Sequence, residues 1–227
     1  MPKLSVIHLH GMPVFQQLQL EEALFRAGRG SWVLFNEGTP PAIVMGISGM
    51  PNEVRPGCPY PVIRRFSGGG TVVVDEGTLF CSLILDGAPV PLTPSDVMRW
   101  SRELFRPAFL PHELVLEEQD YVLDGQKVGG TAQSFSRGRV VHHVSFLWSW
   151  QEERMAWLPL PQRQPAYRAG REHTAFCNQL SRYFPSKDAC IRALLDALSA
   201  HFECRQTAQY EAEKFLAFPH RTAVTYS

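Results

Sequence analysis

The chain has 227 residues, of which 44% are hydrophobic and 19% are charged, a composition that supports a buried core and excludes a disordered polypeptide. Its 22 basic and 22 acidic residues cancel, which argues against a protein that mainly binds nucleic acid. It has no run of ~18 apolar residues and no signal-peptide core at the N-terminus. We therefore expect a cytoplasmic protein that binds neither nucleic acid nor membranes.

The elements of the first half alternate between one helix and several short strands. A helix is predicted over 14–27, where Leu20 and Leu24 share one face, and Gly28 ends it. Five β-like runs follow, at 31–36, 42–47, 61–66, 71–74 and 79–85. A Pro-rich connector is predicted over 87–92.

A second helix is predicted over 93–105, because Thr93 suits the N-cap, Pro94 the first helical position and Asp96 the capping box. The block 112–133 is typical of strand, turn and strand, with Asp124–Gly125 as a hairpin turn. One more long strand is predicted over 139–150.

The last part of the sequence is helical in pattern. Helices are predicted over 171–184, over 187–202 behind the N-cap Ser186, and over 208–218. Strands in the middle with helices gathered at both ends predict an α+β fold, with a mixed or antiparallel central sheet and flanking helices.

Three consecutive glycines stand just before the strand at 71–74. Such a loop allows a close backbone approach and presents N–H groups to an anion. Gly68, Gly69 and Gly70 therefore suit a phosphate or carboxylate, with Arg65 and Ser67 as further donors. The run is neither a P-loop, which needs G-K-[ST], nor a dinucleotide fingerprint, because a β-branched stretch follows.

Lys127 is a second cationic position, two residues beyond a predicted hairpin turn and beside Gly129–Gly130. Alone, such a lysine is usually an exposed surface residue. Two glycine-flanked cationic loops at neighbouring strand ends, however, suit a substrate in which a carboxylate meets a phosphate.

Two stretches carry a family resemblance. "RRFSGGGTVVVDEGTLFCSLI" (64–84) and "DGQKVGGTAQ" (124–133) resemble the arginine–glycine and lysine motifs of the lipoate–protein ligase A family. "LQLEEALFR" (18–26) and "VVHHVSFLW" (140–148) are similar to its first helix and to a strand that usually contains H-G-T. The resemblance implies a catalytic fold shared with biotin protein ligases.

The resemblance also implies a reaction and its binding residues. Lipoate or octanoate would react with Mg-ATP to give an acyl-adenylate, and the acyl group would then pass to a lysine of a lipoyl domain, in E2 subunits of 2-oxoacid dehydrogenases or in the glycine cleavage H protein. Lys127 would contact acyl carboxylate and phosphate. The positions implied for the nucleotide are Arg65, Gly70, Thr71, Val72 and Val73.

Asp75 matches an aspartate of the family and is equally suited to binding and to capping the turn at 76–78. Val72–Val74 and Ile84 are expected to shape a tunnel for the acyl chain. The chain departs from the family pattern at Val74, where a histidine is frequent, and at His143, a usual glycine.

We expect residues 1–227 to form one catalytic domain without the C-terminal accessory domain of two-domain ligases, and to act as a monomer with a possible separate accessory protein. Two alternatives remain open. One is an octanoyl or lipoyl transferase that moves the acyl group between carrier proteins without ATP. The other is a relative that binds a lipoyl carrier or a nucleotide without catalysis.

The cysteines and histidines bear on these alternatives. A transferase needs a thiolate, and the stretch 109–127 before the lysine contains no cysteine, which favours the ligase. Because the number of cysteines is odd, they are expected to be reduced thiols. They are Cys58, Cys81, Cys177, Cys190 and Cys204. His8 and His10 lack a nearby ligand to complete a metal set, so no protein-held metal is expected.

Overall fold

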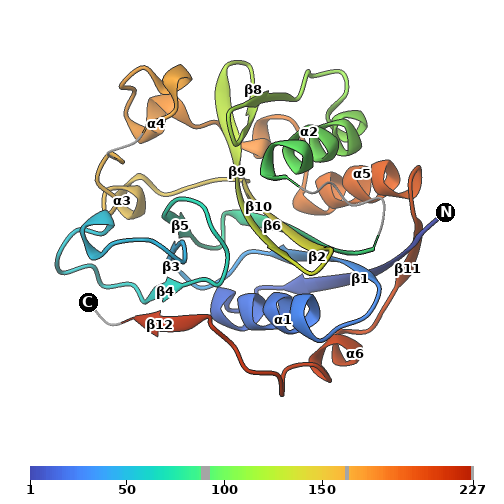
Figure 1. Cartoon of the computed structure of the whole chain (residues 1–227). Coiled ribbons are helices and arrows are strands. Elements are labelled where there is room, and N and C mark those ends of the chain that lie inside the picture. The colour runs from blue at the N-terminus through green and yellow to red at the C-terminus, as the bar shows by residue number, and fades with distance from the viewer. Residues whose placement is uncertain (88–92, 162–163, 226–227) are drawn as a thin grey trace.

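An eight-stranded mixed sheet runs through the centre of the molecule (Figure 1). The structure is a computed structural model that describes residues 1–87, 93–161 and 164–225. The first three strands of the sheet are parallel to one another and all other neighbours are antiparallel. In spatial order the strands are β11 (Glu203–Gln206), β1 (Lys3–His10), β2 (Ser31–Glu37), β6 (Thr78–Asp86), β10 (Arg139–Leu147), β9 (Gln126–Ser136), β8 (Asp120–Leu123) and β7 (Val115–Glu117).

A second, four-stranded sheet lies beside the large one (Figure 1). Its strands in spatial order are β12 (Ala223–Thr225), β4 (Val62–Arg64), β3 (Ala42–Met45) and β5 (Val72–Val74). The glycine run lies in the loop from β4 to β5, so the small sheet fixes both ends of that loop.

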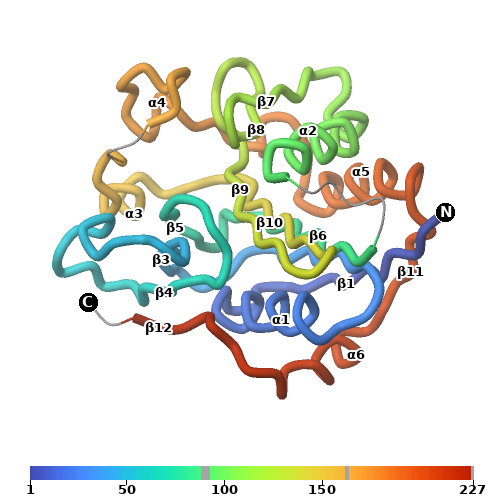
Figure 2. The backbone as a smooth tube through the Cα atoms, in the orientation of Figure 1, coloured from blue at the N-terminus to red at the C-terminus, as the bar shows by residue number. Residues whose placement is uncertain are grey.

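Helices cover both faces of the large sheet (Figures 1 and 2). The helix α1 (Val14–Arg26) lies on one face, and α2 (Pro94–Phe105) and α5 (Lys187–Ser199) lie on the other. Strand β6 supplies both cores, because neighbouring side chains of a strand point to opposite faces. Leu83 packs with the α2 and α5 residues, whereas Ile84 packs with those of α1. The predicted α+β class is confirmed.

The remaining helical segments are short. They are the α-helices α3 (Glu152–Met155), α4 (His173–Phe176) and α6 (Gln209–Glu213), and the 3-10 turns η1 (Pro51–Glu53), η2 (Arg106–Phe109), η3 (Ala166–Arg168) and η4 (Leu180–Arg182). Among the described residues no helix is long and apolar enough to cross a membrane. All five cysteines are free, as predicted.

The predicted N-caps Thr93 and Ser186 and the predicted hairpin turn are confirmed. The Thr93 hydroxyl accepts the backbone N–H of Asp96 at 3.2 Å, and α2 begins at Pro94. The Ser186 hydroxyl caps α5 in the same way. Asp124 and Gly125 join β8 to β9 with positive φ angles of 50° and 72°, as a tight hairpin turn requires. Of the predicted connector, residues 88–92 lie outside the described residues.

The helix predicted over 171–184 is wrong. Only the single turn of α4 and the 3-10 turn η4 form there. Between them the chain is extended, and the N–H of Asn178 donates to the carbonyl of Lys127 at 2.7 Å while Cys177 pairs in parallel with Lys127. The helical spacing of Phe176 and Leu180 was overridden by this tertiary pairing, which brings the segment to the edge of β9.

Candidate functional site

A cavity of about 1290 Å³ lies between the small sheet, strands β9 and β10, and the segment 155–177. Its walls differ in character. Apolar side chains from α1, β5 and β6 form one wall, including Leu18, Val72, Val74 and Phe80. The glycine loop and Lys127 form a polar wall. A site of this shape accommodates a molecule with an apolar part and an anionic part.

The glycine loop is packed between two other backbone segments. The N–H of Gly68 donates to the carbonyl of Gln133 in β9 at 3.0 Å. On the other side, a Cβ added to Gly46 would lie 2.2 Å from the carbonyl oxygen of Gly69, which itself has φ of 114°. A Cβ on Gly70, by contrast, would meet nothing within 4 Å. The loop therefore needs glycine for close approach and leaves Gly70 facing the open cavity.

Arg65 holds this loop in place from inside. Its side chain is buried, and its guanidinium donates to the carbonyls of Gly68 (3.1 Å), Gly70 (2.9 Å) and Val44 (3.3 Å). Burial lowers the pKa of Arg65 to about 10, so the group keeps its charge at neutral pH. Its Nε is buried without a hydrogen-bond partner among the described residues. Arg65 thus fixes the loop and places a cation in the cavity wall.

Lys127, in the same polar wall, is paired with a carboxylate. Its Nζ is 2.7 Å from Oδ1 of Asp120, and the other oxygen of Asp120 accepts the hydroxyl of Tyr167 at 2.8 Å. All three residues are partly or wholly shielded from solvent, and Asp120 and Lys127 line the cavity. A bound anion would therefore compete with Asp120 for the ammonium group.

The other predicted site residues divide into two groups. Thr71, Val72 and Val73 line the cavity with Gly69 and Gly70, and the Thr71 hydroxyl donates to Glu53. Ser67 is buried beside the cavity, outside its lining. Asp75 also lies outside the lining. Its carboxylate accepts the N–H of Gly77 at 2.8 Å and pairs with Arg154 at 2.7 Å, so Asp75 takes the capping role.

Of the residues expected to shape the acyl tunnel, Val72–Val74 line the cavity, whereas Ile84 packs against α1 and does not.

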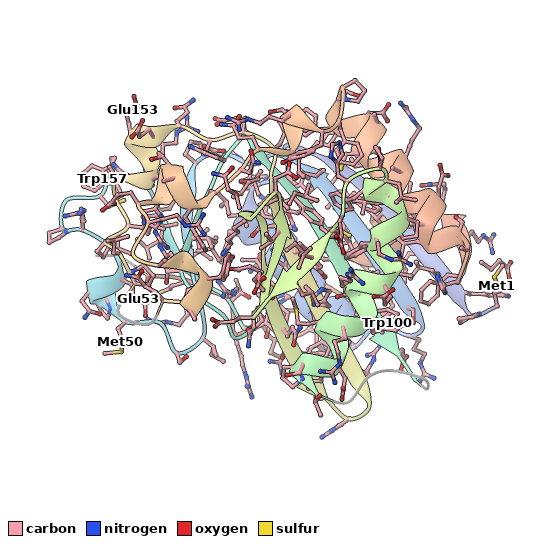
Figure 3. The ribbon with its side chains drawn as sticks, turned by 90° about the horizontal axis from the view of Figure 1, so that it is seen from above. Met1, Met50, Glu53, Trp100, Glu153 and Trp157 are labelled. Atoms are coloured by element: carbon pink, nitrogen blue, oxygen red, sulfur yellow. The ribbon has the colours of Figure 1, made fainter. Side chains whose placement is uncertain are left out.

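Several cavity residues were missed by sequence reasoning. Asp120, Arg168, His173 and Cys177 come from two segments far apart in the chain, and Tyr167 contacts Asp120 from outside the cavity lining. Asp120 lies beside Lys127 because β8 pairs with β9, whereas the pairing of the 177–178 segment with β9 brings the segment of Arg168, His173 and Cys177 to Lys127. The end of the molecule opposite Met1 carries Met50 and Glu53, which also line the cavity, and Glu153 and Trp157 lie on that same side (Figure 3).

Cys177 bears on the transferase alternative. The stretch 109–127 before the lysine contains no cysteine, but Cys177, from a later segment, lines the same cavity and its backbone pairs with that of Lys127. Burial raises the pKa of the Cys177 thiol, and the positive charges of Lys127 and Arg168 oppose this without overcoming it. The group is therefore a protonated thiol in this arrangement. Cys81 and Cys190 are fully buried core residues.

A polar network lies beside Phe80 of the apolar wall. His143 lines the cavity, and its Nδ1 lies 3.0 Å from the carboxylate of Glu21 and 2.9 Å from the hydroxyl of Ser82. The same carboxylate accepts hydrogen bonds from Ser82 (2.7 Å) and Gln17 (2.8 Å). The His143 side chain thus fills a position that a glycine would leave open.

This network predicts an acid-sensitive contribution to stability. Burial alone would raise the pKa of Glu21, but the charge of His143 and the hydrogen bonds outweigh it, and the pKa lies below its usual 4.5. A lowered pKa stabilises the folded state above the unfolded-state value, and the contribution is lost as pH falls through the folded-state value. Between about pH 5 and pH 3, urea unfolding should show a steeper loss of stability in the wild type than in Glu21→Gln.

The control for this experiment is Glu203→Gln, at an exposed position on β11. It should keep the wild-type slope. Parallel curves for the wild type and Glu21→Gln would contradict the proposed ionisation of Glu21.

The comparison with protein families shows to which family the chain belongs. The model described as the lipoyl protein ligase A/B catalytic domain matches residues 13–203. The chain belongs to this family. The matched range includes the glycine loop, Lys127 and Cys177, and so covers the whole polar wall of the cavity.

One curated relative of this chain is a Plasmodium falciparum protein named inactive lipoate–protein ligase 2. The two are 26% identical over 234 residues, which cover 74% of this chain and 60% of the relative. The chain thus spans less than two thirds of that relative's length.

Solved structures of lipoate ligases share the fold. A bi-partite lipoate protein ligase from Thermoplasma acidophilum, studied with its E2 lipoyl domain, superposes with a TM-score of 0.78 at 19% identity, covering 96% of this chain and 91% of that chain. A lipoate-protein ligase A bound with ATP gives a TM-score of 0.74 at 19% identity, with 95% and 92% covered. These matches confirm the predicted catalytic fold.

Proposed function

We propose that this chain activates lipoate or octanoate with ATP and transfers the acyl group to a lysine of a lipoyl carrier domain. The observation that carries the proposal is the single cavity that joins an apolar wall around Val72–Val74 and Phe80 to Lys127 and the glycine loop. Family membership and the ATP bound to one similar structure support it.

In the first step a carboxylate oxygen of the acid would attack the α-phosphorus of ATP, and pyrophosphate would leave with its electron pair. Negative charge builds on the phosphoryl oxygens during this attack. Lys127 and the loop N–H groups would stabilise that charge, having been positioned before the reaction. Mg²⁺ would enter as part of the substrate, on the phosphates of ATP.

In the second step the neutral ε-amine of a carrier lysine would attack the acyl carbonyl of the adenylate. An amide bond forms, AMP leaves and the amine loses a proton. The apolar wall would hold the acyl chain during both steps, and the Lys127 ammonium would move from Asp120 towards the anionic substrate.

Carrier lipoyl domains, as in E2 subunits or the glycine cleavage H protein, are the proposed acceptors. One similar structure is described as bi-partite and was studied with its E2 lipoyl domain, which supports both this acceptor class and a separate accessory protein. The test is the intact mass of an apo lipoyl domain after incubation with the chain, lipoate or octanoate, and Mg-ATP. An ATP-dependent acyl mass gain supports the ligase, and a gain obtained only from an acyl carrier protein contradicts it.

A second candidate, the transferase, is favoured by the position of Cys177 in the cavity. Its thiolate would attack the thioester of an acyl carrier protein, release the carrier thiol and hold the acyl group as a new thioester. The lysine amine of the lipoyl domain would then attack this thioester, form the amide and release the Cys177 sulfur. The raised pKa of Cys177 is unfavourable for this route.

The two routes predict opposite effects of Cys177→Ala. Under the ligase proposal the variant should transfer acyl groups within about threefold of the wild-type rate, because Cys177 contributes only packing. Cys81→Ala is no useful control, since that thiol is in the core, and exposed Ser181→Ala serves instead. Loss of activity in Cys177→Ala, together with an acyl mass on the wild-type chain, would establish the transferase.

The non-catalytic alternative remains testable in the same assay. One relative is named inactive, whereas Arg65, Gly69, Gly70 and Lys127 all line one cavity here. Binding of an acyl-adenylate analogue without any transfer would support the non-catalytic alternative.

A further inference from the structure

We propose that His8, His10 and Glu37 form a binding site for a divalent transition metal ion, with Zn²⁺ as the ion that best fits the donors. The site lies at the ends of β1 and β2, outside the lining of the cavity. It is independent of the proposed acyl transfer.

The backbone pairing of β1 and β2 assembles the three donors. The strands run parallel with His10 opposite Glu37, and His8 lies on the same side of β1 as His10. Oε1 of Glu37 is 3.1 Å from Nε2 of His8 and 3.2 Å from Nδ1 of His10. One ligand atom from each residue lies within 4.8 Å of the other two.

These separations fit the size of a zinc site. With metal–ligand bonds of about 2.0–2.1 Å in a tetrahedron, neighbouring ligand atoms lie about 3.3 Å apart. The two distances to Glu37 are already close to that value, so a rotation of the exposed His10 ring would complete the set. Two imidazoles and one carboxylate leave a fourth position for water, as is usual where zinc has three protein ligands.

The His8 ring is otherwise poorly satisfied. Its Nε2 is buried and makes no hydrogen bond of good geometry among the described residues, although the Glu37 oxygen is near. The rings of His8 and His10 lie with centroids 4.7 Å apart at 34°. A buried imidazole nitrogen beside a second imidazole and a carboxylate is a suitable ligand for a transition metal.

The surrounding charges neither prevent nor create the site. On α5, Asp188 acts on His8 as a negative charge, and Lys187 interacts with Glu37 as a positive one. The first charge favours a bound cation and the second disfavours it. The sequence did not indicate the site, because the carboxylate is supplied by Glu37 on a neighbouring strand.

The metal would have a structural role at the border of the cavity. The chain after Glu37 continues to Thr39, whose N–H donates to the carbonyl of Asp75 at 3.2 Å, just after the cavity strand β5. A metal that links β1 to β2 would therefore stabilise the segment after β2, which in turn holds β5 in the cavity wall. None of its three ligands reaches the cavity lining.

The test is calorimetric titration of the untagged, chelator-treated full chain with Zn²⁺, and with Mg²⁺ as a hard-ion comparison. We expect one Zn²⁺ per chain, a rise in melting temperature, and no comparable binding of Mg²⁺. His10→Ala, at a largely exposed position, should keep the fold and weaken Zn²⁺ binding by at least about 100-fold. His201→Ala, at another exposed histidine, should bind as the wild type does.

Substitution of Co²⁺ identifies the donors. A tetrahedral cobalt spectrum without a thiolate charge-transfer band, lost in Glu37→Gln, is the expected result. Absence of Zn²⁺ binding, equal binding by His10→Ala and the wild type, or a thiolate band would each overturn the proposal, the last because it would assign the metal to cysteines.

Discussion

Lys127→Ala should slow acylation of a lipoyl domain by about 10²–10³-fold, the usual cost of removing one preorganised group that stabilises transition-state charge. The ammonium group is held in the cavity by a 2.7 Å ion pair with Asp120, which is itself fixed by Tyr167. Removal of the amine would leave Asp120 as an unpaired negative charge beside the incoming phosphate. The loss should therefore appear in the rate more than in the stability of the fold.

The measurement is the rate of mass gain of an apo lipoyl domain under saturating acid and Mg-ATP. Lys214→Ala is the matched control, because Lys214 is an exposed lysine paired with Glu211 near α6. It should retain the wild-type rate. If Lys127→Ala remained within a few-fold of the wild type, Lys127 would have no part in the chemistry.

Gly69→Ala should damage the glycine loop itself. Gly69 has φ of 114°, a backbone conformation that costs a residue with a side chain about 1–3 kcal/mol. Its Cβ would also lie 2.6 Å from the Arg65 guanidinium and 2.8 Å from the carbonyl of Thr131, a backbone atom that cannot yield easily. We expect a lower melting temperature and loss of nucleotide binding together.

Gly70→Ala is the matched control for the fold. Its added Cβ meets nothing within 4 Å and projects into open space in the cavity, so stability should stay close to the wild type. Nucleotide affinity, measured by calorimetry with an acyl-adenylate analogue, should fall in both variants, whereas melting temperature should fall only in Gly69→Ala. Equal stability of the two variants would contradict the packing described for the loop.

Much of the fold was predictable because its signals are local. The caps at Thr93 and Ser186 and the turn at Asp124–Gly125 depend on residues within a few positions, and all three are confirmed. The strands β2, β3 and β6 are apolar runs bounded by turn residues.

The unpredicted elements depend on partners far away in the chain. Strand β1 is interrupted by histidines and is stabilised by β2 and by β11, about 200 residues later. Strand β12 is three residues long and forms only against β4. The prediction of a helix over 171–184 failed for the same reason, since the pairing of this segment with Lys127 competes with helix formation.

The candidate site was half predictable. The glycine run and Lys127 were found from residue types that suit anions, and the cavity contains both. Arg65 was expected as an anion donor, yet three of its hydrogen bonds go to backbone carbonyls. Asp120 and Cys177 were not foreseen, because no local pattern distinguishes them from an ordinary strand aspartate and a core cysteine.

The most direct test of the central claim separates transfer from activation. A chemically prepared octanoyl- or lipoyl-adenylate is mixed with an apo lipoyl domain, with and without the chain, and the mass of the domain is followed over time. If the cavity binds the adenylate and delivers its acyl group, the chain will accelerate amide formation, and Lys127→Ala will not, even where activation needs a further protein. A rate equal to that of the uncatalysed mixture would contradict the account.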